Sequence, residues 1–291
     1  MRRSASAPRG WAAALLAALV ALLGVGCSSP PVRTTNVAHE AALALNQRAA
    51  RALQRGDNAQ ALALYEQALT AADSVEDFDT GGATLLNLAA VHARLGQSPQ
   101  AHQRVDRILG APGRFTGALQ AQAAARKALL YLDAPDLAAA LQWADKAEAG
   151  CAAPCAQSAA LTGLRAHVAL ERGDAAAAAV LASRAATQAE AAQQRAEQAN
   201  AQRLLGRAQM RLGDHAAAAA SLQRALDIDR ALGLPERIAL DLLHAGENAQ
   251  RSRQPATARE FYERALQVGE AAGLTRSAET ARARLKALDA R

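Results

Sequence analysis

One turn signal recurs along this chain at a nearly constant interval. Gly56-Asp57, Gly96-Gln97, Gly173-Asp174 and Gly213-Asp214 each separate two segments with helical periodicity. Glycine ends a helix because it adopts the left-handed conformation without strain, and aspartate caps the helix that follows. Equivalent turns lie about 38 to 40 residues apart along the chain. Because a pair of helices recurs with this period, the chain is predicted to be a stack of helix pairs.

The fullest copy of this unit runs from Ala199 to Ala225, and its two amphipathic segments meet at Gly213-Asp214. Small side chains on both segments allow antiparallel helices to approach closely, while leucines fill the seam between them. The small residues are Gly206, Ala218 and Ala225, and the leucines are Leu205, Leu222 and Leu226. With small and large positions in this order, the unit resembles a tetratricopeptide repeat. The period of about 40 residues resembles the long-helix variety of that family.

The same spacing places two further turns near Pro135 and Arg253, where the glycine is missing. We therefore expect six repeats between residues 37 and 274 and a capping helix at residues 275–291. One face of that last helix is apolar and carries Ala281, Leu285 and Leu288. The resemblance implies an all-α fold, a right-handed α-solenoid of about six helix pairs that the final helix covers.

Composition agrees with closely packed helices. Apolar residues make up 51% of the chain, but aromatic residues make up only 3%, so the core is predicted to consist mainly of Ala and Leu. No segment alternates apolar and polar residues over the length of a strand, and we expect no sheet. From Ala175 to Leu205 there is no Gly or Pro, so only the period places a loop near Gln193-Gln194. One continuous long helix is the alternative.

Residues 1–26 have the pattern of an export signal, with Arg2, Arg3 and Arg9 ahead of an apolar stretch. That stretch leads through small residues to Cys27, which resembles a bacterial lipoprotein signal. The resemblance implies a lipid, palmitate included, on Cys27 and a tether over residues 27–36. A serine after the cysteine implies the periplasmic face of the outer membrane. An uncleaved signal anchor and an ordinary secretory signal are the alternatives.

Cys151 and Cys155 stand in a predicted loop, four residues apart. In an oxidising periplasm the pair can form a local disulfide, which would close a small ring. Two free thiols are the second interpretation. A redox or metal function is the third, although the spacing differs from C-x-x-C and no histidine cluster accompanies the pair.

Neither the charge nor the motifs favour an enzyme or a nucleic-acid-binding protein. The net charge of +6 falls to about +3 once the three arginines of the export signal are removed, which is too small a surplus to argue for nucleic acid. The tripeptide Asp79-Thr80-Gly81 occurs once, beside a predicted helix, whereas an aspartic protease needs two such carboxylates on strands. The histidines form no H-E-x-x-H motif and no two-His helical pair. We expect no catalytic site, no metal site and no cofactor.

An arginine stripe is the most suggestive surface feature. Arg203, Arg207 and Arg211 are spaced i, i+4, i+8 and share a helix face. The resemblance implies that the first helix of each pair lines a groove, where these guanidinium groups could bind acidic side chains or a peptide carboxylate. A solvated face is the alternative. Comparable groove positions in other repeats hold Asn46, Asn87, Arg94, Arg126, His167, Glu247 and Arg251.

The leading functional hypothesis is a periplasm-facing outer-membrane lipoprotein that acts as a non-catalytic scaffold or adaptor in cell-envelope assembly. Its partners would be envelope proteins or peptides, with a lipid anchor in the membrane and neither nucleic acid nor a small-molecule substrate. A self-associating structural envelope protein is one alternative, and an envelope enzyme with an unrecognised site is another.

Overall fold

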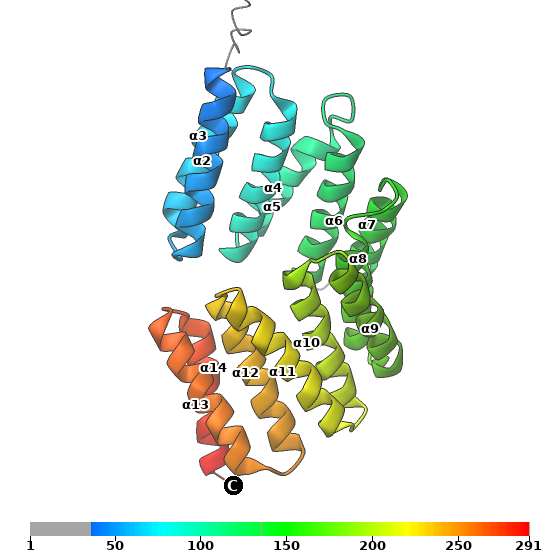
Figure 1. The fold of residues 1–291 in the computed structure, drawn as a ribbon, viewed down its shortest axis with the longest axis vertical. Helices are drawn as coiled ribbons and strands as arrows, with labels where there is room; N and C mark the ends of the chain where they lie inside the picture. Colours follow the sequence, from blue (N-terminus) through cyan, green and yellow to red (C-terminus); the bar gives the residue numbers. More distant parts are fainter. Residues whose placement is uncertain (1–35, 135, 291) are drawn as a thin grey trace, which may run out of the picture.

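The computed structural model describes residues 36–134 and 136–290. This part of the chain forms thirteen helices and contains no strand (Figure 1). The predicted export signal, Cys27 and most of the tether lie outside the described residues, as does Pro135. The all-α solenoid predicted from the repeats is confirmed.

The helices form six antiparallel pairs and a final single helix. In chain order the pairs are α2 (Val37–Gln54) with α3 (Asn58–Asp73), α4 (Phe78–Arg94) with α5 (Ser98–Leu109), α6 (Gly117–Asp133) with α7 (Leu137–Ala149), α8 (Ser158–Glu171) with α9 (Ala175–Ala191), α10 (Arg195–Arg211) with α11 (His215–Ala231), and α12 (Pro235–Arg251) with α13 (Pro255–Ala271). The single helix α14 (Thr275–Asp289) packs against α13 and α12.

The loops explain the period. At Gly213 the backbone is left-handed, with φ of 83°, and the Asp214 carboxylate then accepts a 3.0 Å hydrogen bond from the Ala217 amide. Gln193 and Arg253 adopt the same conformation without being glycines, with φ of 55° and 61°. The loop predicted near Gln193-Gln194 is therefore confirmed, and the alternative of one long helix is wrong.

The first helices of the pairs stack on one another, and each second helix packs beside its own first helix. The row of pairs curves so strongly that the ends of α4 and α12 face each other across the gap in Figure 1. Arg94 on α4 spans this distance and forms a 3.0 Å ion pair with Glu236 on α12. The curvature brings side chains of distant repeats to one face.

The core changes in character along the row. The first two pairs bury large side chains, and Tyr65, Leu85, Leu88 and Ile108 belong to one cluster. Around α9 the buried residues are alanines. In the fifth pair, a Cβ atom on Gly206 would lie 2.7 Å from Leu222 Cγ, so the helices are closer there than an alanine would allow. This agrees with the close seam predicted for that repeat.

Candidate functional site

A hollow of about 450 Å³ opens on the layer of first helices. Its apolar wall comes from four successive first helices, α6, α8, α10 and α12, which converge because the row curves. We call it the leucine hollow after its leucines, which are Leu129, Leu132, Leu164, Leu204 and Leu240. Its polar lining includes Arg203, Arg207 and His244. It is the candidate site because it combines a concave apolar surface with a few convergent polar groups.

Arg203 does not present its guanidinium at the surface, and its side chain is only 9% exposed. Its Nε donates to Asp241 Oδ1 at 2.5 Å, its Nη2 donates to Asp229 Oδ2, and both carboxylates are 0% exposed. Arg203 thus lines the leucine hollow with a guanidinium that two buried carboxylates already hold. The helix face that carries Arg203 is interior because α10 packs there against α11 and α12.

A sequence signal for this buried ion pair existed and was missed. Asp229 follows Leu222 and Leu226 at the spacing of a core-facing helix stripe, so a carboxylate stands where an apolar residue is expected. Asp241 lies 38 residues after Arg203, close to one full repeat. A carboxylate on a core stripe needs a cation nearby, because an unpaired buried charge is costly.

Two carboxylates share one guanidinium in this triad of Arg203, Asp229 and Asp241. Burial raises the pKa of Asp241 to about 6, with the neighbouring Asp229 carboxyl adding to the rise and Arg203 opposing it. Asp229 Oδ1 and Asp241 Oδ2 are both buried without a hydrogen-bond partner. The structure therefore favours a proton held on Asp241, which keeps the triad near neutrality below pH 6.

The other two stripe residues connect neighbouring repeats. Arg207 Nη2 donates to Glu171 Oε1 at 3.2 Å, and Arg211 Nη1 donates to the carbonyl oxygen of Leu170. Both acceptors lie at the end of α8. The stripe thus joins α10 to α8 and to α12, and Arg207 also lines the leucine hollow.

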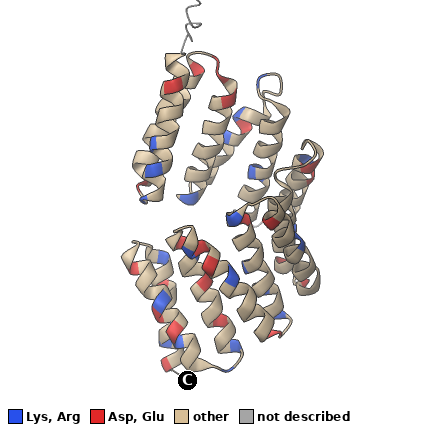
Figure 2. Ribbon diagram, viewed as in Figure 1, with Lys and Arg blue, Asp and Glu red and all other residues tan. Residues whose placement is uncertain are grey.

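Of the remaining predicted groove residues, His167 lines the leucine hollow, and the others lie outside its lining. Arg94 pairs with Glu236, and Arg251 pairs with Glu247 on its own helix at 2.8 Å. The structure does not bring these charges together. Asn87 is exposed on α4, and Arg126 is half-buried on α6. Charges of both signs are intermixed over the ribbon, as Figure 2 shows.

His244 lines the leucine hollow, a role that its place in the sequence did not indicate. Within the part of the chain that the structure describes, its ring makes no hydrogen bond. Burial lowers the pKa of His244 to about 3, and Arg207, Arg203 and Arg284 lower it further by repulsion. The ring is therefore neutral at physiological pH and has both a donor and an acceptor to offer.

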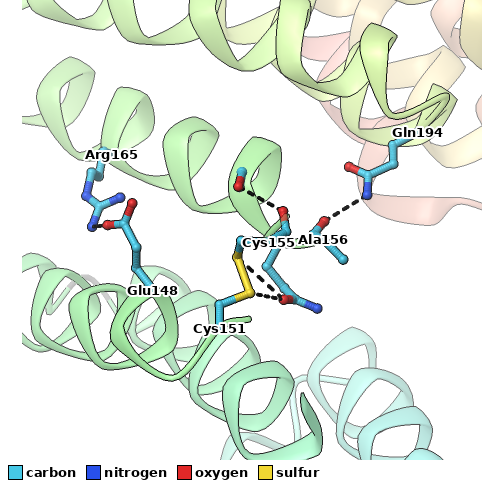
Figure 3. The surroundings of a disulfide bond; sticks show 8 residues. Glu148, Cys151, Cys155, Ala156, Arg165 and Gln194 are labelled. Carbon is cyan, nitrogen blue, oxygen red and sulfur yellow. Dashed lines mark hydrogen bonds and ion pairs between the residues drawn. A yellow bond between two sulfur atoms is a disulfide. The ribbon is translucent and has the colours of Figure 1, made fainter. Parts of the chain in front are cut away.

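The structure joins Cys151 and Cys155 by a disulfide (Figure 3). The loop is held on both sides. Ser158 Oγ donates to the Cys155 carbonyl at 2.8 Å, and Gln194 Nε2 donates to the Ala156 carbonyl at 2.8 Å. Because Gln194 belongs to the loop before α10, the disulfide loop connects the third repeat to the fifth.

Among the described residues, no group of three or more His, Cys, Asp or Glu side chains is placed to hold a metal ion. None of the described helices is both long and apolar enough to cross a bilayer.

No protein-family model matches the sequence, and no curated protein matches it. Solved structures match in fold. The tetratricopeptide-repeat STAND ATPase of Pyrococcus horikoshii has a TM-score of 0.62 at 12% identity, over 84% of this chain and 36% of that one. Cut9, from the APC/C hetero-tetramer Cut9–Hcn1, has a TM-score of 0.61 at 15% identity, over 86% of this chain and 43% of that one.

PilW, a type IV pilus biogenesis factor, has a TM-score of 0.53 at 18% identity, over 82% of this chain and 97% of that one. The chain spans less than half the length of the ATPase and of Cut9. At these identities the likeness concerns the fold alone. The chain has the fold of a tetratricopeptide-repeat solenoid.

Proposed function

We propose that this protein is a non-catalytic scaffold that binds a partner protein or peptide through the concave face of repeats three to six. The observation that carries the proposal is the leucine hollow, where four first helices converge on an apolar surface. The lining also includes the His244 ring, which makes no hydrogen bond within the described residues. A helical-repeat row offers such a surface without needing any rearrangement of its core.

The comparisons support this proposal at the level of the fold. Cut9 is found assembled with Hcn1, and PilW is a factor of pilus biogenesis. Both use stacked helix pairs of the same kind. A function in assembly, rather than in catalysis, is what this architecture supports best here.

We also propose that a lipid on Cys27 anchors the scaffold to the periplasmic face of the outer membrane. Nine residues, 28–36, separate this cysteine from α2. Fully extended they reach about 30 Å. That tether would hold the helical row just clear of the bilayer, within reach of envelope proteins.

Photocrosslinking in cells tests the scaffold. A photoreactive residue at position 240 probes the leucine hollow. The same residue at position 180 serves as control, because Val180 is 70% exposed on the second-helix layer. Discrete protein adducts from position 240, absent at position 180, are expected. Adducts from position 180 alone would place the binding surface on the other layer and contradict the proposal.

The anchor is tested separately by Cys27→Ser. The variant is expected to leave the membrane fraction, because serine lacks the thiol that would carry the proposed lipid. Mass spectrometry of the wild-type N-terminus should show a lipidated cysteine. If the variant stays in carbonate-washed membranes, an uncleaved signal anchor holds the protein instead.

A further inference from the structure

Two of the large apolar side chains that line the leucine hollow are exposed. Leu129 on α6 and Leu240 on α12 are 37% and 40% exposed, and they line the hollow from opposite sides. Apolar groups gathered in a concavity mark a binding surface more often than apolar groups scattered singly. The volume of about 450 Å³ lies within the usual range of ligand pockets and has room for one or two bulky side chains.

The charges around the hollow are already matched. Arg207 pairs with Glu171, and Arg203 is held between Asp229 and Asp241. Glu197 adds a carboxylate to the lining. An acidic ligand would have to compete with these carboxylates for the guanidinium groups, so charge complementarity favours an uncharged occupant.

His244 adds a polar requirement. Its neutral ring lines the hollow and makes no hydrogen bond within the described residues. A polar group that stays unpaired when an apolar ligand covers it costs free energy. A peptide backbone amide supplies both a donor and an acceptor beside its own side chain, whereas an acyl chain supplies neither.

We infer that the leucine hollow binds an uncharged peptide segment of the partner protein. One bulky apolar side chain lies among Leu129, Leu204 and Leu240, and the adjacent backbone amide pairs with His244. This inference rests on the proposed scaffold function and names the chemistry of its ligand. It also replaces the acidic partner that the arginine stripe suggested.

The test uses the full chain, isolated from membranes and held in phospholipid nanodiscs. The probes are fluorescent nonapeptides of Gly, Ser and Asn with a central Leu, Phe, Ala or Glu. Fluorescence anisotropy is expected to show that the Leu and Phe peptides bind at least about tenfold more tightly than the Ala peptide, because three or more carbons are buried. The Glu peptide is expected to bind no better than Ala.

Matched variants locate the binding. Leu240→Asn should weaken binding of the Leu peptide about tenfold. Leu212→Asn should leave its affinity unchanged, because Leu212 is an exposed leucine (54%) outside the hollow lining. His244→Leu should weaken binding of the Leu peptide severalfold, and His244→Gln should recover much of the lost affinity. Circular dichroism confirms that each variant is folded, and empty nanodiscs give the lipid background.

Several results would overturn the inference. A preference for the Glu peptide that Arg207→Gln abolishes would restore the acidic partner, and the proposed scaffold would stand. Absence of peptide binding, or binding that Leu240→Asn leaves intact, would also reject it.

Dodecanoate binding that Leu240→Asn abolishes, without peptide binding, would assign the hollow to an acyl chain. Crosslinks between two copies through position 240 would assign it to self-association. Failure of the scaffold itself would appear instead as the absence of protein adducts from position 240 in cells.

Discussion

The first and fifth repeats place different chemistry at the same position of the fold. Asn46 and Arg203 each lie ten residues before the glycine of their turn, Gly56 or Gly213. Each bonds a residue 38 positions further on, Thr84 in one case and Asp241 in the other. The N-terminal pair is neutral, with Asn46 Nδ2 donating to Thr84 Oγ1 at 2.9 Å. The C-terminal pair is ionic.

The third member of the triad sharpens this contrast. The position of Asp229 corresponds to Ala72 in the first repeat, and both residues are 0% exposed. The first repeat therefore has an alanine where the fifth repeat buries a charge. The lesson is that this fold does not require the ion pair, since a neutral hydrogen bond and apolar packing fill the same place.

The largest expected effect comes from removing the cation. Arg203→Met leaves Asp229 and Asp241 facing each other without their guanidinium, so we expect a loss of about 3–5 kcal/mol in the free energy of unfolding. Asn46→Ala removes only a neutral hydrogen bond and should cost about 1 kcal/mol. Denaturant unfolding followed by circular dichroism measures both variants. Equal losses would contradict the comparison.

The second prediction concerns pH. The pKa of Asp241 rises from 3.8 to about 6 on folding. A raised carboxyl pKa means that the folded state binds the proton more tightly, so this contribution to stability is present below pH 4 and is lost as pH rises through 6. A shift of about two pKa units corresponds to about 3 kcal/mol. Denaturant unfolding from pH 4 to pH 8 should show this decline in wild type and not in Asp241→Asn.

A smaller effect is expected at the helix seam. A Cβ atom on Gly246 would lie 2.6 Å from Tyr262 Cδ1, whereas the corresponding N-terminal residue, Ala89, is buried with its methyl group accommodated. Gly246→Ala should therefore cost about 1–3 kcal/mol by overpacking. Ala89→Gly should cost about 1 kcal/mol through helix propensity. Thermal unfolding compares the two, and a stabilised Gly246→Ala would show that the seam has room.

The smallest expected effect tests the comparison directly. The triple variant Arg203→Asn, Asp241→Thr and Asp229→Ala gives the fifth repeat the side chains that the N-terminal repeats have at the same positions. We expect the triple variant to lie within about 1 kcal/mol of wild type or above it, because neutral replacement of a buried ion network is often tolerated. A loss as large as that of Arg203→Met alone would show that the C-terminal repeats depend on the charges.

Much of the fold followed from local chemistry in the sequence. Gly213 and Asp214 predict where one helix ends and the next begins, because backbone conformation and capping are properties of a few adjacent residues. Gln193 and Arg253 show the limit of this reasoning. They adopt the left-handed conformation without a sequence signal of their own, and only the period of the repeat locates them.

The tertiary structure decided which side chains face inward and which meet across repeats. The spacing of Arg203, Arg207 and Arg211 fixes a shared helix face, but packing against α11 and α12 made part of that face interior. His244 and Leu129 belong to repeats six and three, and only the curvature of the row brings them to one hollow. The sequence thus determined the repeating unit, because its turns and seams are local. The tertiary structure determined the site, because a concave surface arises from the angles between repeats.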